Sequence, residues 1–310
     1  MEGIKFGVEN RELSKIVLGL MRIDKFSIKE GIQLLETAYE SGINMIDLAD
    51  IYGGGVCEEI IGNVFKEKPY LRDKFYVQSK CGIRHDCGTK WYDNSASYLK
   101  ESVDKALQRL NTDHIDCYLL HRPDVLMDAS ETAEAMKELK SSGKVIDFGV
   151  SNHNVQQIKR LQDNLDFKLA TNQVQLSCAF TPMIDSGIHV NMKDDAGIMR
   201  QDGILEYCQR KDITVQTWSS LQHGFIQGTF LGNPGYERLN SVLNEIAMET
   251  SSSPMAVAIA WLLRIPGKIQ AIVGTTKCDR IKEVAKANEI SLTRPQWYRI
   301  YLAVEGNYLP

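Results

Sequence analysis

ETAEAMKELKSSGKVIDFGVS, residues 131–151, is the stretch that decides the fold. A segment with helical spacing ends at Ser142-Gly143, and the β-branched run 145–151 follows at once. Ser41-Gly42 precedes the run 44–49 in the same way. A glycine just past a helix accepts the left-handed backbone that stops it. The stretch therefore predicts a helix, a glycine stop and a buried strand, in that order.

The same alternation extends along the chain. Eight short apolar runs occur, at 15–20, 44–49, 75–80, 115–121, 145–151, 170–177, 213–219 and 269–275. Longer segments with helical spacing separate most of them, which predicts a parallel sheet, either open and doubly wound or closed into a barrel. The count of eight favours closure. We therefore expect an α/β fold, a single (β/α)8 TIM barrel domain over residues 1–310.

The two ends and the helices of this barrel can be outlined as well. Residues 4–17 predict an N-terminal hairpin across the barrel bottom, and the segment after Ser291 predicts a C-terminal helix packed outside it. The buried helix faces are expected at Ile28, Ile32, Leu35 and Tyr39, and at Leu99, Val103, Ala106 and Leu110. The expected N-caps are Ser27, Asn94, Ser130, Asn152 and Ser253. Gly149 is read, like Gly42 and Gly143, as a turn residue.

Composition excludes several classes of protein. The 310 residues are 43% hydrophobic and 25% charged, with a formal net charge of -4, which argues against a nucleic-acid partner. The longest apolar run, 255–263, is too short to cross a bilayer, so no membrane partner is expected. The seven cysteines form no C-x-x-C pair, which predicts no metal site and reduced thiols in a cytoplasmic protein.

Three motifs of common enzyme classes are absent from the sequence. G-x-G-x-x-G does not occur, because Glu58 stands where the third glycine would follow Gly53 and Gly55. The P-loop pattern and the G-x-S-x-G elbow are missing too. A Rossmann dehydrogenase, a P-loop enzyme and an α/β-hydrolase are therefore excluded.

Four ionisable residues stand at or just after the ends of neighbouring predicted strands: Asp47, Tyr52, Lys80 and His121. In a TIM barrel these ends meet at one mouth, where the active site lies. A phenol gives up its proton more easily beside an ammonium group, and an aspartate would hold that ammonium in place. The histidine would orient a carbonyl oxygen or share in proton transfer. The set predicts an acid that protonates an oxyanion and works with a hydride donor.

Six motifs resemble those of the aldo-keto reductase family, in order and spacing: NMIDLADIYGGG (44–55), VQSKCG (77–82), YLLHRPD (118–124), FGVSNH (148–153), TNQVQLS (171–177) and IVGTTKCDRI (272–281). The resemblance extends from Leu18 to about Glu283. It is strongest to the bacterial general reductases related to potassium-channel β subunits.

The resemblance implies a role for each matching residue. Asp47, Tyr52, Lys80 and His121 match the catalytic tetrad, with Tyr52 as the general acid. The implied cofactor is NADP, bound as NADPH. Ser151, Asn152 and Gln173 match the residues that bind the nicotinamide carboxamide, and Trp218 matches an aromatic that stacks on its ring.

The remaining implied cofactor contacts involve the phosphates. Ser219, Leu221 and Gly224 lie in the loop over the pyrophosphate. Gly274, Thr275, Thr276 and Arg280 match the segment that binds the 2′-phosphate. Gly19, Met21 and Arg22 are further expected contacts, and Asp47 belongs to both the catalytic and the cofactor set. Gly274 stands where many relatives carry a lysine, which Lys277 could replace, and Val284 stands where many carry an adenine-binding asparagine.

These residues support one main hypothesis and two alternatives. The main one is NADPH-dependent reduction of a small aldehyde or ketone by direct hydride transfer. The alternatives are an NADP-binding regulatory subunit with vestigial activity and an aldolase that forms a Schiff base on Lys80. The loops at 84–95, 122–128, 178–196 and 222–235 are expected to set the substrate, with Trp91, Tyr92 and Phe180 in the pocket wall. The sequence leaves three points open: the substrate, the oligomeric state and whether residues 177–196 act as a lid.

Overall fold

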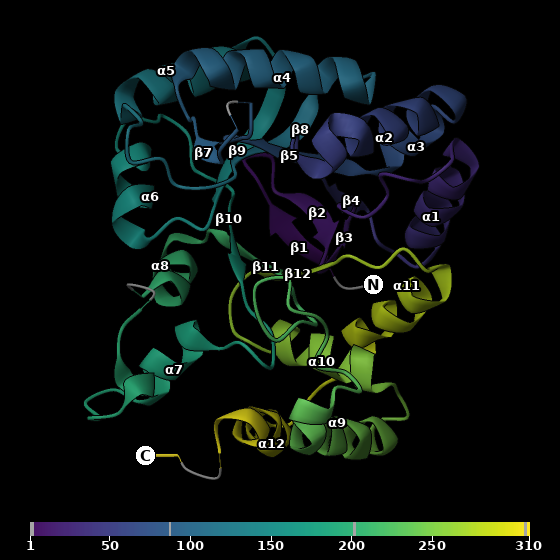
Figure 1. The fold of residues 1–310 in the computed structure, drawn as a ribbon, viewed down its shortest axis with the longest axis vertical. Helices are drawn as coiled ribbons and strands as arrows, with labels where there is room; N and C mark the ends of the chain where they lie inside the picture. The colour runs from purple at the N-terminus through teal and green to yellow at the C-terminus, as the bar shows by residue number, and fades with distance from the viewer. Residues whose placement is uncertain (1–2, 87, 201–202, 307–308) are drawn as a thin grey trace.

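The computed structural model describes residues 3–86, 88–200, 203–306 and 309–310. Its centre is a closed barrel of parallel strands in the order β10-β11-β12-β3-β4-β5-β8-β9 (Figure 1). Their bounds are β3 (Ile16–Gly19), β4 (Met45–Asp47), β5 (Tyr76–Cys81), β8 (Ile115–Leu120), β9 (Val145–Ser151), β10 (Thr171–Gln175), β11 (Thr214–Trp218) and β12 (Ile269–Val273). Each strand coincides with one predicted run, β5 extending one residue past its run of 75–80, so the closed barrel is confirmed and the open sheet is excluded.

Helices surround this barrel on all sides in Figure 1. They are α1 (Ile28–Glu40), α2 (Val56–Glu67), α3 (Tyr70–Lys74), α4 (Ala96–Leu110), α5 (Ala129–Ser141), α6 (Val155–Gln162), α7 (Pro182–Ile188), α8 (Ile204–Lys211), α9 (Glu237–Glu249), α10 (Pro254–Leu263), α11 (Cys278–Ala285) and α12 (Arg294–Glu305). The main apolar core lies between helices and strands. It includes Leu99, Val103, Ala106 and Leu110, as the spacing of that helix predicts.

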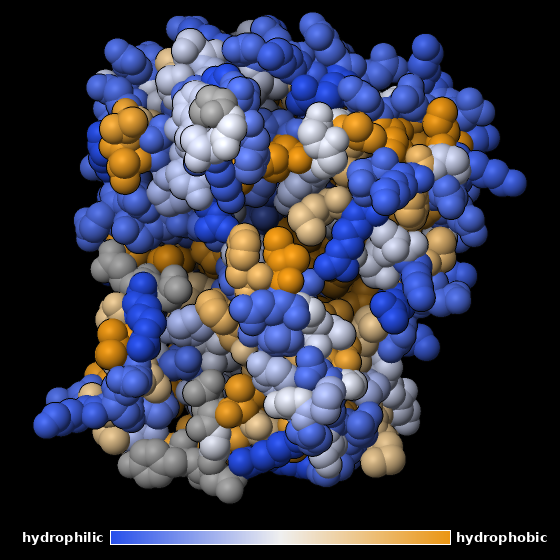
Figure 2. All heavy atoms as spheres, in the orientation of Figure 1, coloured by the Kyte–Doolittle hydropathy of each residue, from blue (hydrophilic) through white to orange (hydrophobic). Residues whose placement is uncertain are grey.

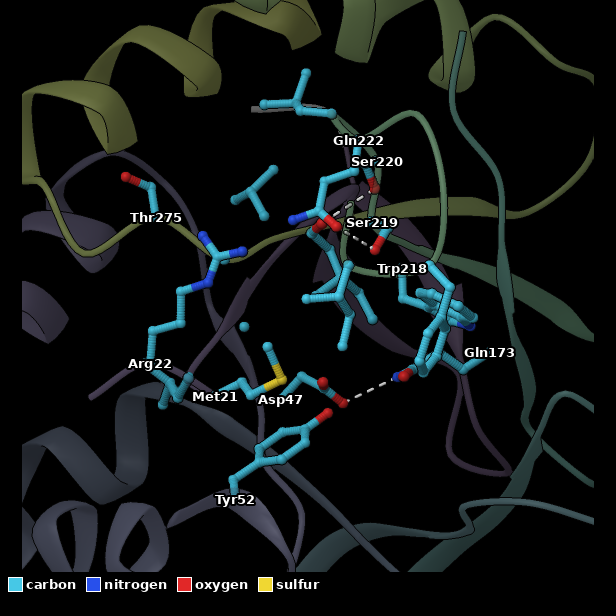
Figure 3. A pocket seen from close by; sticks show the side chains of 18 of the residues that line it. Met21, Arg22, Asp47, Tyr52, Gln173, Trp218, Ser219, Ser220, Gln222 and Thr275 are labelled. Carbon is cyan, nitrogen blue, oxygen red and sulfur yellow. Dashed lines mark hydrogen bonds between the residues drawn. The ribbon is translucent and has the colours of Figure 1, made fainter. Parts of the chain in front are cut away.

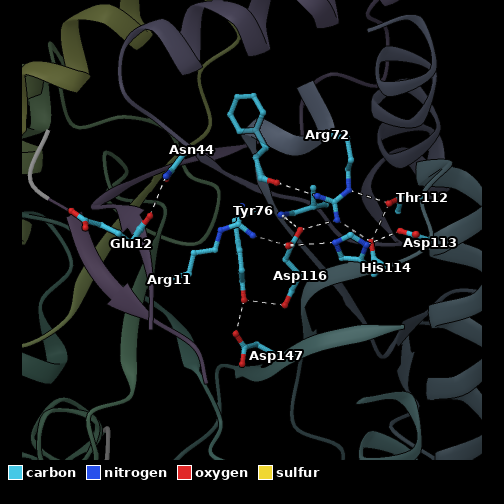
Figure 4. A network of polar contacts seen from close by, with 12 residues as sticks. Arg11, Glu12, Asn44, Arg72, Tyr76, Thr112, Asp113, His114, Asp116 and Asp147 are labelled. Atoms are coloured by element: carbon cyan, nitrogen blue, oxygen red, sulfur yellow. Dashed lines mark hydrogen bonds and ion pairs between the residues drawn. The ribbon is translucent and has the colours of Figure 1, made fainter. Parts of the chain in front are cut away.

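The predicted hairpin, β1 (Gly3–Phe6) with β2 (Arg11–Ser14), lies within the outline of the ring in Figure 1. Phe6 and Leu13 are buried in a small apolar cluster with inward-facing residues such as Val17 and Met45. A polar network fixes the same end of the barrel (Figure 4). In it, Asp116 bonds Arg72 at 2.9 Å, and the Tyr76 hydroxyl donates to Asp147 at 2.6 Å. The bottom of the barrel is therefore closed.

The C-terminal helix α12 packs outside the barrel, as expected. The rings of Trp261 and Trp297 stack with centroids 4.8 Å apart. Each indole N–H donates to the other residue's carbonyl, at 3.0 and 3.1 Å. These reciprocal contacts join α12 to α10.

Several local expectations are wrong. Leu35 is buried as predicted, but Ile28 and Tyr39 are 42% and 41% exposed, because α1 turns Leu34 and Ala38 toward the core in their place. Gly31 lies in the middle of this face, where a Cβ would press against Val64, so the close approach of α2 rotates the buried stripe.

The capping expectations fail in three places, each by one or two residues. Ser27 and Ser253 are caps as expected, but Ser95, Asp128 and Asn154 cap α4, α5 and α6 in place of Asn94, Ser130 and Asn152. Gly149 lies inside β9 rather than in a turn. There a Cβ would meet the backbone and side chain of Thr171, so the strands of the barrel need the glycine for close packing.

Three further findings concern the described part of the chain. None of its helices alone has the length and apolar composition to cross a membrane; only segments 234–249 and 254–263, bent by 91°, pass that test together. No cluster of three or more His, Cys, Asp or Glu side chains within it could hold a metal ion. Its cysteines, at 57, 81, 117, 178, 208 and 278, are all free, and Cys87 lies outside the described residues.

Gly62→Ala should destabilise the protein strongly. Gly62 lies where α2 crosses α4, and a Cβ there would overlap the carbonyl oxygen of Arg109. Because that neighbour is backbone, the helices must separate, and we expect the free energy of unfolding to fall by about 2 kcal/mol or more. Chemical denaturation measures this loss. Gly187→Ala in α7 is the control, since its Cβ would meet only the end of Glu206 at 3.4 Å; equal losses in both variants would contradict the packing argument.

Candidate active site

A cavity of about 550 Å³ opens at the C-terminal ends of the barrel strands. Figure 2 shows hydrophobic side chains gathered over the middle of the ring, within a surface that is otherwise mainly hydrophilic. Fifteen of the predicted site residues line the cavity: Gly19, Met21, Arg22, Asp47, Tyr52, His121, Ser151, Asn152, Gln173, Trp218, Ser219, Leu221, Gly274, Thr275 and Arg280. The cavity is therefore the place where most of the sequence-based candidates meet.

The four residues of the predicted tetrad come together on its floor. The ammonium group of Lys80 donates to Asp47 Oδ2 at 2.8 Å, to the carbonyl of Leu48 at 2.7 Å and to the Tyr52 hydroxyl at 3.1 Å. Lys80 is fully buried, directly beneath the cavity wall. The His121 ring lies edge-on to the Tyr52 ring, with centroids 5.9 Å apart. One side of the Tyr52 hydroxyl therefore contacts Lys80, and the ring of His121 lies beside that of Tyr52.

Three glycines after Tyr52 place this residue. Gly53, Gly54 and Gly55 all have positive φ, at 58°, 66° and 99°. Residues that carry a side chain rarely adopt this left-handed backbone conformation. A Cβ on Gly53 would also press against Asp24. The three glycines thus let the chain turn from β4 into α2 within a few residues, with Tyr52 held over the barrel.

Burial and charge set the protonation of the tetrad. Burial raises the pKa of Tyr52, and Lys80 lowers it, as expected, but offsets the burial only in part, so that Tyr52 rests as a phenol. Burial lowers the pKa of Lys80, but the attraction of Asp47 and Tyr52 outweighs it and leaves the pKa raised. Burial, followed by the charges of Lys80, Arg122 and Lys90, holds the pKa of His121 well below its usual range. The site thus contains a phenol, an ammonium and a neutral imidazole.

Glutamine side chains inside the barrel hold Asp47 from below. Gln78 and Gln173 each donate to Asp47 Oδ1, at 2.6 and 3.0 Å. Both also donate to Gln216, which donates in turn to Gln270 at 2.9 Å. Sequence reasoning missed Gln78, Gln216 and Gln270. The available signal was the position of these long polar side chains within strands, on the face that alternation turns inward.

The residues expected to bind a carboxamide form a hydrogen-bonded group with Trp218. Figure 3 shows one of them, Gln173, beside Trp218. Asn152 donates to Ser151 Oγ at 2.9 Å and accepts from the indole N–H of Trp218 at 3.0 Å. Ser151 Oγ donates to the carbonyl of Gln173 at 2.9 Å. The side-chain oxygens of Asn152 and Ser151 each keep a second lone pair, so they can still accept hydrogen bonds from the N–H groups of an amide.

The opposite end of the cavity carries cations. Figure 3 shows Arg22 and Thr275 on the side away from Trp218 and Gln173. Arg280 lines the cavity as well, and in the described structure neither arginine makes an ion pair. The two cations make this end suitable for a phosphate group.

Some expected residues do not reach the cavity wall. Gly224 packs beside Gln227, and Thr276 and Lys277 lie beyond Thr275, outside the set that lines the cavity. Trp91, Tyr92 and Phe180 do not line it either. Trp91 instead bonds Asp86 at 2.9 Å and lies under Arg84. Other lining residues belong to loops that the sequence predicts to set the substrate, namely Lys90, Arg122, Gln222, Phe225, Ile226, Thr229 and Leu231, and Val284 lines the cavity at the position matched to an adenine-binding asparagine. The lining residues that sequence reasoning missed are Leu20, Ile51, Gly53, Ile83, Ser220, Met255, Ile272 and Val273.

The fold and the site define a (β/α)8-barrel enzyme. Residues 15–304 match the model of the aldo/keto reductase family. The chain is 34% identical to oxidoreductase YdhF of Escherichia coli over all of both chains. It is 36% identical to a 6-dehydroglucose reductase of Agrobacterium fabrum, covering 95% of each. A crystal structure of an aldo/keto reductase from Klebsiella pneumoniae with NADP and acetate superimposes with a TM-score of 0.76, at 25% identity, covering 96% of this chain and 94% of that one.

The chain belongs to the aldo/keto reductase family. The resemblance seen in its six motifs is therefore confirmed over nearly its whole length. It is an oxidoreductase, and the expected enzyme class is confirmed with it.

Asp50, next to the tetrad, should make stability depend on pH. Burial, and next the charge of Glu58, raise the pKa of its carboxyl to about 7. Between about pH 4 and pH 7 the folded protein thus holds a proton that the unfolded chain has released, so stability falls as the pH rises through this window. Asp50→Asn carries no charge and lacks this loss.

Urea denaturation at pH 5 and pH 8 checks the effect. The difference in unfolding free energy between Asp50→Asn and the wild type should shift in favour of the variant at the higher pH. The exposed Asp166→Asn gives the baseline for the same chemical change. A difference that stays constant between the two pH values would contradict the burial argument.

Proposed function

We propose that this protein reduces an aldehyde or ketone to an alcohol with NADPH, by direct hydride transfer and with Tyr52 as the general acid. One observation carries the proposal. The Tyr52 hydroxyl accepts a bond from the buried Lys80 and, among the described residues, donates to none. Its proton is thus available to a group in the cavity, while Lys80 supports the negative charge that develops when the proton leaves.

The residues present fit an NADP cofactor. The paired acceptors Ser151 and Asn152, with Gln173 and Trp218, suit a nicotinamide carboxamide and its ring. Arg22 and Arg280 suit phosphate at the other end of the same cavity. Gly274 lies open to the cavity, since a Cβ there would meet nothing within 4 Å. When bound, NADPH supplies the hydride.

The side chains of the site then divide the work on the substrate. His121 is neutral, and a neutral imidazole carries one N–H group. This group can donate a hydrogen bond that orients the carbonyl oxygen. Tyr52 passes its proton to the oxygen as that oxygen becomes an alkoxide. Asp47 keeps Lys80 against Tyr52. The apolar wall, with Ile83, Phe225 and Ile226 among its members, keeps water from the reacting atoms.

The geometry argues against the aldolase alternative. A Schiff base needs a free amine, but the three N–H donors of Lys80 are all engaged and its pKa is raised. Such a lysine is held as an ammonium ion and is not a nucleophile. The complete tetrad also favours catalysis over a purely regulatory role.

Tyr52→Phe should lower kcat by about 100-fold or more, because it removes the acid that protonates the substrate oxygen. Binding of NADPH, followed by quenching of protein fluorescence, should change little. Tyr70→Phe is the matched control, since its hydroxyl bonds Glu36 on the surface. Reduction rates are measured on a panel of aldehydes and ketones, sugar carbonyls included. Wild-type rates in the Tyr52→Phe enzyme would show that Tyr52 is not the general acid.

Arg280→Ala should weaken NADPH binding about tenfold and leave NADH binding nearly unchanged, since only NADPH carries the 2′-phosphate. Titration of each cofactor against protein fluorescence measures both constants. Lys282→Ala, on the exposed side of the same helix, controls for a general loss of positive charge. An equal loss for the two cofactors would place Arg280 away from the 2′-phosphate.

A further inference from the structure

The substrate side of the cavity carries positive charge that the tetrad does not use. Lys90 and Arg122 both line the cavity, close to His121. Lys90 stands directly before β7 (Trp91–Tyr92), which pairs with β6 (Ile83–Arg84) in a small hairpin after β5. Arg122 follows His121 at the end of β8. Because β5 and β8 are neighbours in the barrel, the two cations come from adjacent loops.

These cations lie far from the end that suits the cofactor phosphates. Thr275 and Arg280 follow β12, and Arg22 follows β3. In the closed barrel β12 and β3 lie two to four strands from β5 and β8. A cofactor that reaches from Trp218 to Arg280 therefore has its phosphates away from Lys90 and Arg122. These two cations are left for another ligand.

No carboxylate of the described cavity wall neutralises them. Asp47 is the acidic member of that wall, and its oxygens already hold Lys80, Gln78 and Gln173. The nearby acids of the β6–β7 hairpin, Asp86 and Asp93, both pair with Arg84.

Aromatic rings hold the two cations without cancelling their charge. The Arg122 guanidinium lies 5.8 Å from the ring centroid of Trp218 and 5.7 Å from that of Phe225. The Lys90 ammonium lies 5.9 Å from the Tyr92 ring. A guanidinium on an aromatic face keeps its in-plane N–H donors free, and these match the oxygens of a carboxylate or phosphate. Both charges also help to lower the pKa of His121, after burial and Lys80, which indicates that they act on the place where the carbonyl would bind.

We propose that Lys90 and Arg122 form an anion site for the substrate, so that the preferred substrate is an aldehyde or ketone that also carries a carboxylate or phosphate group. This inference rests on the proposed reductase function and narrows it to a substrate class. The anionic group binds between the β5 and β8 loops while the carbonyl lies at Tyr52 and His121. At low ionic strength the same charges speed the arrival of such substrates.

Two matched pairs of substrates test the site. Succinate semialdehyde is compared with its uncharged amide, 4-oxobutanamide, and glyceraldehyde 3-phosphate with glyceraldehyde. We expect kcat/KM to favour the charged member of at least one pair by about tenfold, the effect of one charge-assisted hydrogen bond. Which pair shows the preference identifies a carboxylate or a phosphate, and added salt should reduce it.

The double variant Lys90→Gln/Arg122→Gln should bring the preference within each pair down to about twofold or less, since it removes charge and keeps much of each side chain's length. Lys66→Gln, an exposed change on α2, should keep the wild-type preference. A wild-type enzyme that turns over both members of each pair equally overturns the anion site and leaves the proposed reductase function standing.

Binding of succinate to the NADPH-loaded protein, measured by calorimetry, tests the site without turnover. The wild type should bind it at least about tenfold more tightly than the double variant. Equal binding, or none to the wild type, overturns the inference. Clear binding without turnover of any aldehyde or ketone instead counts against the proposed function and supports the anion site.

Discussion

The ion pair between Lys80 and Asp47 is the interaction on which the rest of the site depends. A fully buried ammonium is costly unless its charge is paired and its N–H groups are all bonded. Both conditions are met, because Lys80 donates to Asp47, to the Leu48 carbonyl and to Tyr52. Asp47 is held in turn by Gln78 and Gln173, and through Gln216 and Gln270 the bonds continue to the carbonyl of Ser14 in the hairpin. The Tyr52 hydroxyl at the mouth is thus held by a chain of contacts that crosses the barrel interior.

The two ends of the barrel are built for different purposes. At the bottom, the hairpin and the Arg72–Asp116 and Tyr76–Asp147 contacts satisfy polar groups with one another. Residues with positive φ occur at both ends: Asn10 and Asn111 lie in turns at the bottom, with φ of 53° and 50°, whereas Asn152, Ser219 and Ile226 line the cavity, with φ of 60°, 54° and 55°. Such conformations cost free energy and persist where the surrounding structure imposes them, often at functional sites. The polar groups at the bottom are thus satisfied by one another, whereas the three positive-φ residues at the mouth lie in the wall of the cavity.

Sequence reasoning succeeded where one residue's chemistry and its place in a repeat agreed. The eight strands followed from β-branched runs between helices, and the meeting of Asp47, Tyr52, Lys80 and His121 followed from their positions at or just after the ends of those runs. It failed where neighbours compete for one role. Asn94 and Ser95 are both good caps, and only the tertiary position of α4 selects Ser95. The face of α1 was misplaced because Ile28 and Tyr39 share the helical period, whereas the contact at Gly31 fixes the rotation. The prediction that Trp91 lies in the cavity wall failed for a similar reason, since Trp91 contacts Asp86 and Arg84 in its own hairpin.

The net shift of Tyr52 needed the structure as well, because burial and the charge of Lys80 act in opposite directions and their balance cannot be read from residue types. The charge of the cavity wall also differs from that of the whole chain. The chain carries a net charge of -4, yet Arg22, Lys90, Arg122 and Arg280 line this one cavity. The lowered pKa of His121 keeps its ring neutral, so it adds no further charge to this wall. The two pairs of cations come from different loops of the barrel, since Arg22 and Arg280 follow β3 and β12, whereas Lys90 and Arg122 follow β5 and β8, two to four strands away.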